Sequence, residues 1–328
     1  MQSEASPPSK RLLTSQASKD TGVKKQLLVA VTEGGQENYN NVKVILSLLD
    51  IQEVNFVISC DMKLANILCG LQAHSSSHPC TWCTAESSNL VNCGTLRTFG
   101  SLKQSFHAFS AAGSNTKNAK KFRNLVHESV LSLEDSALVI DLIPPMELHL
   151  LLGVVNHLFK ILKNLWPKAD EWLQALHIKY QPFHGGQFEG NSCNKLLKNL
   201  DLLQILAEKY NAFQVFPIIE TFRKFENVVS CFGNKLHSQF EEKIDEFRAS
   251  FFALPIGTVT PKTHAVFFHI KEFILRKKMP LGIYSEQTTE AMHHCFSTNW
   301  ARYKHPISHP EYEKRVVMCL VDFNSKNL

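Results

Sequence analysis

The stretch "SSHPCTWCTA" at residues 76–85 places two cysteines, Cys80 and Cys83, on either side of a Thr-Trp pair. Two thiols in a CxxC pattern can bind one zinc ion together, but a structural zinc site takes four protein ligands. No second CxxC follows in the chain. The pattern therefore predicts that two more ligands come from a distant segment, which would decide how the chain folds back on itself.

The best candidates for those ligands are His264 and His269, in "THAVFFHI" at residues 263–270. On a regular α-helix, five residues correspond to about 500° of rotation, which leaves the two rings roughly 140° apart. Convergence would need a bent helix or a helix end, and the two residues could also be unrelated histidines. We expect Cys80, Cys83 and the two histidines to form a closed, tetrahedral zinc site.

The CxxC has other interpretations. It could be a pair of free thiols at the start of a helix. A thioredoxin-like redox motif is disfavoured, because the CxxC follows a loop and not a strand. His78 and Cys93 lie close by in the sequence and are spare candidates for zinc ligands. Most of the nine cysteines sit in apolar runs, as buried thiols usually do.

Composition sets wider limits on the class of protein. The chain has 328 residues, of which 44% are hydrophobic and 20% are charged, so we expect a sizeable core. A net charge of +5 permits a nucleic-acid partner without requiring one. No signal-like segment opens the chain, and no apolar run reaches the roughly 18 residues of a membrane span. We expect no membrane association and an intracellular protein, nuclear or cytoplasmic.

The first part of the chain has the pattern of an α/β unit. Residues 1–24 are rich in Ser, Lys and Pro, which predicts a disordered tail. In residues 25–145, the apolar runs Gln26–Val31 and Val54–Cys60 predict two parallel strands joined by a helix. Ala137–Pro145 predicts a third strand, which the two prolines end.

The rest of the chain has helical spacing. Residues 146–258 contain long amphipathic stretches, which predict an all-helical insertion. Residues 259–328 predict further helices, with Pro261 and Ser285 near two helix starts. The predicted fold class is α/β with a partial parallel sheet and a large helical insertion, predominantly helical overall.

This order of elements resembles DDE-type DNA transposases with an RNase H-like fold, in particular the Transib and V(D)J-recombinase arrangement. It is also similar to uncharacterised transposon-encoded proteins of invertebrates. The resemblance covers residues 22–328 and implies that Cys80, Cys83, His264 and His269 bind a zinc ion that supports the catalytic core. It is carried by "CDMKLANILCGLQAHSSSHPCTWC" (60–83), "FHGGQFEGNSC" (183–193), "VTPKTHAVFFH" (259–269) and "YSEQTTEAMHHCF" (284–296).

The resemblance also implies phosphodiester chemistry by two Mg²⁺ or Mn²⁺ ions that three carboxylates hold. Asp61 matches the second acid, and Glu290 matches the third, with Glu286 one turn earlier as the alternative. Either glutamate could instead be a solvated acid near a helix N-terminus. The strands that would carry the first acid have no counterpart in residues 1–24. We therefore expect a truncated RNase H-like sheet with an incomplete two-ion site.

The expected function is that of a transposase-derived protein, a remnant of a DNA recombination enzyme without catalytic activity. DNA is the expected partner, and a homo-oligomer is possible. The alternative is a zinc-stabilised DNA- or protein-binding module, in which Lys117–Arg123 and Arg276–Lys278 contact phosphates or are simply solvated helix faces. A cysteine-based enzyme at Cys193 and His184 is disfavoured, because closeness in sequence is not a catalytic arrangement.

Overall fold

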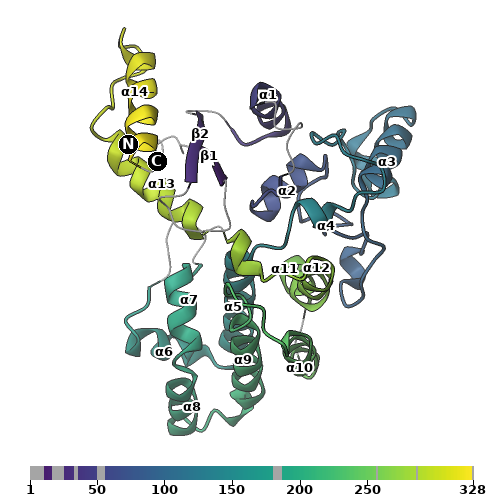
Figure 1. The fold of residues 1–328 in the computed structure, drawn as a ribbon. Coiled ribbons are helices and arrows are strands. Elements are labelled where there is room, and N and C mark those ends of the chain that lie inside the picture. The colour runs from purple at the N-terminus through teal and green to yellow at the C-terminus, as the bar shows by residue number, and fades with distance from the viewer. Residues whose placement is uncertain are drawn as a thin grey trace, which may run out of the picture.

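Helices make up most of the ordered chain in the computed structural model (Figure 1). The structure describes residues 11–16, 26–32, 36–49, 56–179, 187–255, 258–285 and 287–326. One large core runs through the middle of the molecule, and a second, smaller core lies among the C-terminal helices and one strand.

The sheet consists of two antiparallel strands among the described residues. Strand β1 (Arg11–Gln16) pairs with β2 (Gln26–Thr32), with an irregularity in register between Leu13 and Thr14. The prediction of an α/β fold with a partial RNase H-like parallel sheet is therefore wrong. Strand β1 also lies within the segment predicted to be a disordered tail.

Two other predicted strands differ from the structure. Residues 56–60 form neither a helix nor a strand, and residues 50–55 lie outside the described part of the chain. The Ile58 amide donates a hydrogen bond to the Leu142 carbonyl at 2.8 Å, and the Ser59 hydroxyl donates to the Tyr284 carbonyl at 2.9 Å. Val139–Leu142 forms the short helix α4. A short, buried apolar run has the same composition in a strand as in a helix, and this ambiguity misled the prediction.

The helices of the N-terminal half cover one side of the CxxC segment. Helix α3 begins with a capping box, in which the Thr98 side chain and the Ser101 side chain each bond the other's backbone amide. The elements are α1 (Tyr39–Leu49), α2 (Met62–Leu68), η3 (Ser87–Asn89), α3 (Phe99–Ala111), η4 (Thr116–Phe122) and α4 (Val139–Leu142).

The central helices form a scaffold around α5, which buries one apolar face against α7, α9 and α11. Its elements are α5 (Glu147–Leu165), η5 (Pro167–Ala169), α6 (Asp170–Ala175), α7 (Gly190–Leu197), α8 (Leu200–Lys209), η7 (Phe213–Val215), α9 (Phe216–Val229) and α10 (Phe240–Phe252). Inside it, Phe222, Phe225, Phe247 and Phe251 are fully buried.

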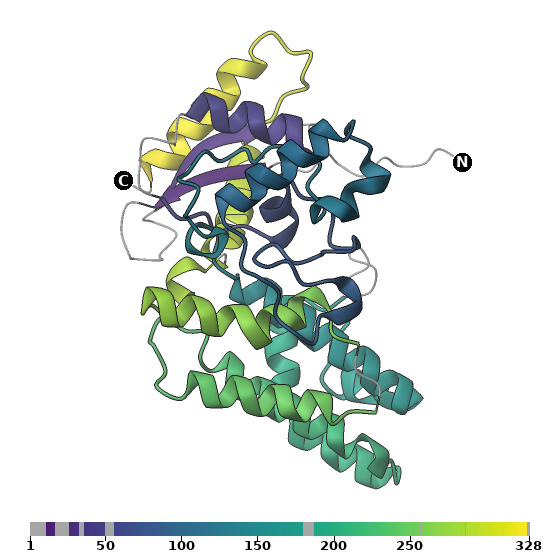
Figure 2. The ribbon, with the colours of Figure 1, turned by 90° about the vertical axis from the view of Figure 1, so that its right-hand side faces the viewer.

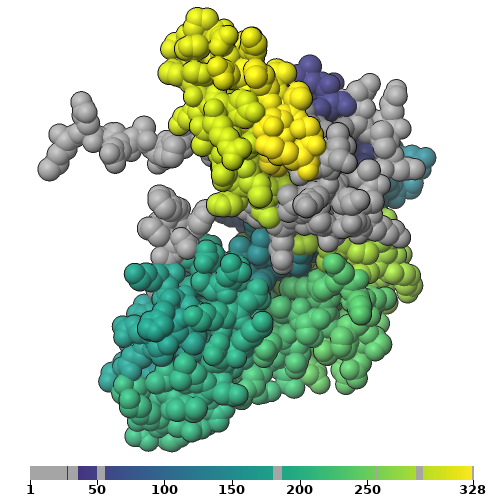
Figure 3. Space-filling model, turned by 60° about the vertical axis from the view of Figure 1, so that its left-hand side comes forward, coloured from purple at the N-terminus to yellow at the C-terminus, as the bar shows by residue number. Residues whose placement is uncertain are grey.

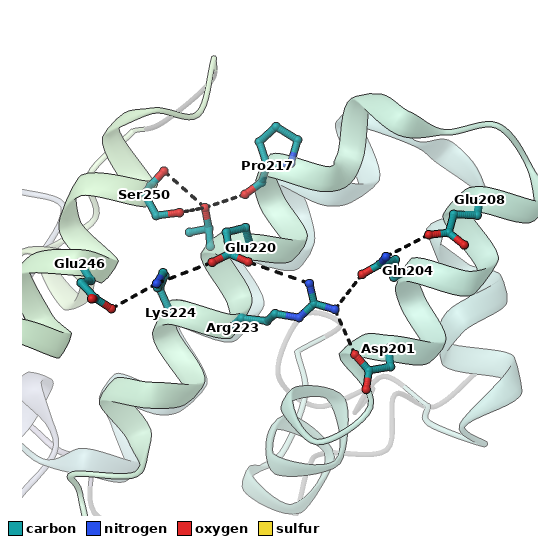
Figure 4. A network of polar contacts seen from close by, with 10 residues as sticks. Asp201, Gln204, Glu208, Pro217, Glu220, Arg223, Lys224, Glu246 and Ser250 are labelled. Carbon is teal, nitrogen blue, oxygen red and sulfur yellow. Dashed lines mark hydrogen bonds and ion pairs between the residues drawn. The ribbon is translucent and has the colours of Figure 1, made fainter.

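The outer face of this scaffold carries a chain of ion pairs (Figure 4). Arg223 on α9 contacts Asp201 on α8 at 3.0 Å, and Lys224 contacts Glu246 on α10 at 3.2 Å. Glu220 lies between the two cations. Pairs this exposed contribute little individually. The buried aromatic rings therefore hold the scaffold together.

The C-terminal helices occupy two places. Helices α11 (Pro261–His264) and α12 (Ile270–Lys277) join through η8 (Ala265–His269), and α12 lies between α4 and α10 (Figure 2). After η9 (Leu281–Tyr284), helices α13 (Gln287–Trp300) and α14 (Tyr312–Ser325) gather at the end of the molecule opposite α6–α9 (Figure 3).

The second core joins the sheet to these last helices. Leu28 of β2 is buried with Met292, Phe296 and Phe323. The side-chain amide of Asn324 donates to the Leu28 carbonyl at 2.8 Å and accepts from the Leu28 amide at 2.9 Å. Asn324 thus satisfies main-chain groups of β2 as a neighbouring strand would. Among the described residues, no helix is both long and apolar enough to cross a membrane.

A bidentate ion pair fastens the end of α12 to α4. The Arg276 guanidinium contacts both carboxylate oxygens of Asp141, at 3.0 and 2.7 Å. This hydrogen bonding holds the pKa of Asp141 below its ordinary value of 3.8. Because the folded pKa is lowered, the stabilisation is present above pH 3.8 and is lost as the pH falls further.

We expect a coupling free energy of about 1 kcal/mol between the two side chains at pH 7, since both are partly exposed. A double-mutant cycle of Arg276→Ala and Asp141→Asn, measured by urea unfolding, checks this value. The coupling should shrink when the cycle is repeated near and below pH 3.8. Additive effects of the two substitutions at pH 7 would contradict the expectation.

Candidate metal centre

Cys80, Cys83, His264 and His269 come together in the core, although the cysteines and histidines are 181 and 189 residues apart. Their ligand atoms all lie within 4.8 Å of one another, and each of the four residues is 0% exposed. In the part of the chain that the structure describes, this is the one group of three or more such residues with converging ligand atoms. The group could hold a metal ion.

The distances fit a single tetrahedral ion. The Cys80 Sγ atom lies 3.1 Å from His269 Nε2, and Cys83 Sγ lies 3.3 Å from His264 Nε2. The two Nε2 atoms are 3.2 Å apart. Zinc bonds of about 2.3 Å to sulfur and about 2.0 Å to nitrogen place tetrahedral ligand atoms about 3.3–3.8 Å apart. The observed spacings are close to that range.

The orientation of the His264 ring also suits metal binding. Its Nδ1 atom lies 2.8 Å from the Leu90 carbonyl oxygen, which can only accept a hydrogen bond. Nδ1 therefore carries the proton, and the lone pair of Nε2 points toward the other ligand atoms. In metal-binding histidines, the ring nitrogen that does not bind the metal usually donates a hydrogen bond to a carbonyl or carboxylate, which fixes the orientation of the ring.

A π turn brings the two histidines onto one side of their helix. Over Ala265–His269 the helix widens from the i→i+4 to the i→i+5 hydrogen-bond pattern. In such a turn, residues five apart lie nearly above one another, and the two ring centroids are 5.0 Å apart. The sequence indicated that a regular helix would separate these rings. The π turn is the local change that removes the separation.

The two residues between the cysteines fix the CxxC loop in place. The Thr81 hydroxyl donates to the Asn66 side-chain oxygen at 2.6 Å, which links the loop to α2. The Trp82 indole donates to the Ile143 carbonyl at 2.7 Å, just after α4. The Trp82 ring also packs against His269, with centroids 5.4 Å apart. The loop is therefore attached to its surroundings independently of a metal.

Sequence reasoning missed Arg97, which lies beneath the loop and is 1% exposed. Its Nε atom donates to the carbonyls of Cys80 and Cys83, at 3.2 and 3.0 Å, and its Nη2 atom donates to the Arg123 carbonyl at 3.3 Å. Burial lowers the pKa of Arg97, and the nearby thiols, when ionised, oppose that effect. A single arginine in "GTLRTFG" (94–100) gives no sign in the sequence that it supports the loop.

The thiols differ in how easily they ionise. A hydrogen bond from Cys80 holds the pKa of Cys83 far below its ordinary value. Burial raises the pKa of Cys80. A bound cation would favour the thiolate form of both side chains.

The spare candidates lie outside the four-residue group. Cys93 is exposed, and its contact with the Cys83 thiolate raises its pKa. His78 is engaged elsewhere, because its Nδ1 atom lies 3.0 Å from the Asn124 side-chain oxygen. Cys193 is buried in α7, and burial raises its pKa to about 12, while His184 lies outside the described residues.

The structure does not assemble the carboxylates expected from the resemblance. Asp61 is the N-cap of α2, where its Oδ1 atom accepts a hydrogen bond from the Leu64 amide at 2.7 Å. Glu290 belongs to α13, but the position of its side chain is not described, and Glu286 lies outside the described residues. Within the described chain, no observation supports a Mg²⁺ or Mn²⁺ site.

The basic stretches have different surroundings. In η4, Lys117, Lys120 and Lys121 are exposed. In the second stretch, Arg276 and Lys277 both contact Asp141, so two of its three cations have a partner within the protein. The first stretch is thus the more accessible to phosphates.

Comparisons with known proteins give little guidance. A family model described as a domain of unknown function (DUF8703) matches residues 8–107, which include the CxxC but not the histidines. None of the curated proteins matches the chain.

We expect Arg97→Leu to lower the affinity of the site for its metal about 10-fold or more, because residues that orient metal ligands typically contribute this much. Because leucine leaves three carbonyls without this donor, circular dichroism should first show that the variant is folded. Competition with a chelator measures the affinity. Arg223→Leu, which removes an arginine far from the site on α9, should leave it unchanged. Equal effects of the two substitutions would exclude a specific role for Arg97.

Proposed function

We propose that Cys80, Cys83, His264 and His269 bind one zinc ion and that this ion has a structural role. The observation that carries the proposal is the convergence of two sulfur and two ring-nitrogen ligands at a fully buried point. Two thiolates and two imidazoles are a ligand set that zinc favours. Four protein ligands leave no position for water or substrate, so the site is closed and does not support catalysis at the metal.

The proposed zinc ion works as a cross-link between two segments whose ligands are 181 and 189 residues apart in the chain. It connects the CxxC loop, which α2 and α4 surround, with the helix formed by α11 and α12. That helix in turn contacts α5 and α10 of the central scaffold. Because the site requires the folded chain, the free energy of zinc binding adds to the free energy of folding.

Purified protein should contain one zinc ion per chain, measured by elemental analysis. The double variant Cys80→Ser/Cys83→Ser should contain none, and its melting temperature should fall by several degrees or more, as loss of a structural metal predicts. Cys93→Ser is the matched control, because it removes a neighbouring thiol outside the four-residue group. A zinc-free parent protein, or loss of zinc in the control, would overturn the proposal.

We also propose that the chain derives from a DDE-type transposase and lacks strand-transfer activity. In support, the residues that the resemblance implied as zinc ligands lie together, although they come from distant segments. A zinc-stabilised binding module without this ancestry is the alternative. That module would bind DNA or a protein. DNA is the partner we expect, with the exposed lysines of η4 as the most accessible cations, and the expected location is the nucleus or the cytoplasm.

The absence of strand transfer can be tested with Mg²⁺ or Mn²⁺ and a labelled DNA substrate. We expect no product from the parent protein. Asp61→Asn is the informative variant, because asparagine caps a helix as well as aspartate does but cannot supply the charge a metal needs. Product formed by the parent protein and lost in Asp61→Asn would refute the claim of inactivity and assign Asp61 a catalytic role.

A further inference from the structure

A cavity of about 610 Å³ is lined in part by Lys262, two residues before His264 in the same helix. Its walls come from α5, from the first residues of α11, from Met62 of α2 and from His74 in the loop before the CxxC. The volume falls within the range of roughly 300–1,000 Å³ that small-molecule sites occupy.

The charge of the lining is of one sign. Three lysines, Lys160, Lys163 and Lys262, line the cavity, and none of the described lining residues is a carboxylate. Lys262 also interacts with another part of the protein. Lys163 has a partner outside the cavity, because its ammonium group lies 2.7 Å from Asp170. Lys160 is exposed, and none of the described acids forms an ion pair with it. A concave surface of this kind concentrates anions from solution.

Polar side chains that line the cavity follow one face of α5. Asn156, Lys160 and Asn164 are spaced at i, i+4 and i+8, so they form a polar stripe about 12 Å long. The opposite face of the same helix is fully buried and includes Val154 and Leu158. A solvated helix face would also be polar, but this stripe of one lysine and two amides forms part of the wall of a cavity.

Apolar side chains complete the lining. Met62, Phe159 and Pro261 border the same space as the lysines. The site therefore combines cations with an apolar wall, which suits a ligand that has several negative charges on an organic body. Burial lowers the pKa of His157, another lining residue, so the fixed positive charge comes from the lysines.

We propose that this cavity binds a phosphate-bearing ligand of nucleotide size, with Lys160 contacting the phosphates and Lys262 adding positive charge to the wall. Ammonium groups are strong point-charge partners of phosphate. Phosphate groups could come from a free nucleotide or from a nucleic-acid strand. We assign the free nucleotide as the ligand, because the volume of the cavity matches that of a small-molecule site. This inference goes beyond the structural zinc and does not require zinc to contact the ligand.

Isothermal titration calorimetry with ATP at low salt, without Mg²⁺, tests the proposal. We expect ATP to bind and adenosine, which lacks phosphate, to bind at least about tenfold more weakly. Lys160→Glu should weaken ATP binding about tenfold or more, because it places a negative charge among the phosphates. Lys262→Gln should weaken binding without introducing a repulsive charge.

Lys103→Glu is the matched control, since it makes the same charge change at an exposed position on α3, away from the cavity. Its affinity for ATP should stay within about twofold of the parent value, because distant surface charges are screened. Equal weakening by Lys103→Glu and Lys160→Glu would overturn the proposal, as would equal affinity for ATP and adenosine or no binding of ATP.

A short single-stranded oligothymidylate separates the two sources of phosphate. Weaker binding of this strand than of ATP supports the free nucleotide, whereas tighter binding overturns that assignment in favour of a strand. Zinc content measured on the same samples keeps this test apart from the zinc proposal. Loss of ATP binding in Lys160→Glu with one zinc ion retained supports the cavity independently of the metal. A parent protein that contains no zinc but binds ATP through Lys160 would support the cavity proposal and overturn the zinc proposal.

Discussion

Four metal-binding side chains converge at one buried point, and the arrangement of the rest of the chain depends on this convergence. The cysteines belong to a loop without regular structure, and the histidines belong to a helix that packs on the central scaffold. Buried polar groups are costly unless they are satisfied. The Nε2 atoms of His264 and His269 are buried and 3.2 Å apart, so each needs a polar partner at this point. A divalent cation satisfies both nitrogens and both sulfurs at once.

Charge balance explains why an arginine accompanies the loop. A zinc ion with two thiolates and two neutral imidazoles has no net charge, so the guanidinium of Arg97 does not serve as its counter-ion. Arg97 instead faces three carbonyl oxygens, including those of Cys80 and Cys83. The dipoles of these carbonyls stabilise the positive charge of the guanidinium. In return, the guanidinium fixes the backbone of Cys80 and Cys83. Hydrogen bonds from Arg97 to its main chain position the loop, whether or not a metal is bound.

The metal-binding residues could be recognised from the sequence because the number of ligands is a chemical requirement. A lone CxxC calls for two more ligands, and the HxxxxH segment offered them. The π turn could not be foreseen, since a change in hydrogen-bond pattern over five residues has no signature in composition. The sheet was predicted wrongly for a related reason: Ala137–Pro145 is apolar and short, and such a run fits a strand or a buried helix equally. Asp61 looked like an acid at the end of a strand, but it begins a helix.

The π turn has a consequence for the spacing of the two histidines. An ordinary α-helix already places residues four apart on one side, so a chain with one residue fewer between His264 and His269 could direct both rings to the same point without any widening. The widened turn accommodates one surplus residue within Ala265–Phe268, and the helix resumes its normal pitch at Ile270. The turn therefore absorbs the additional residue before α12 begins. A deletion within it would restore an uninterrupted α-helix and would leave both the ligand pair and the face that α12 presents to α4 and α10 close to their present orientation.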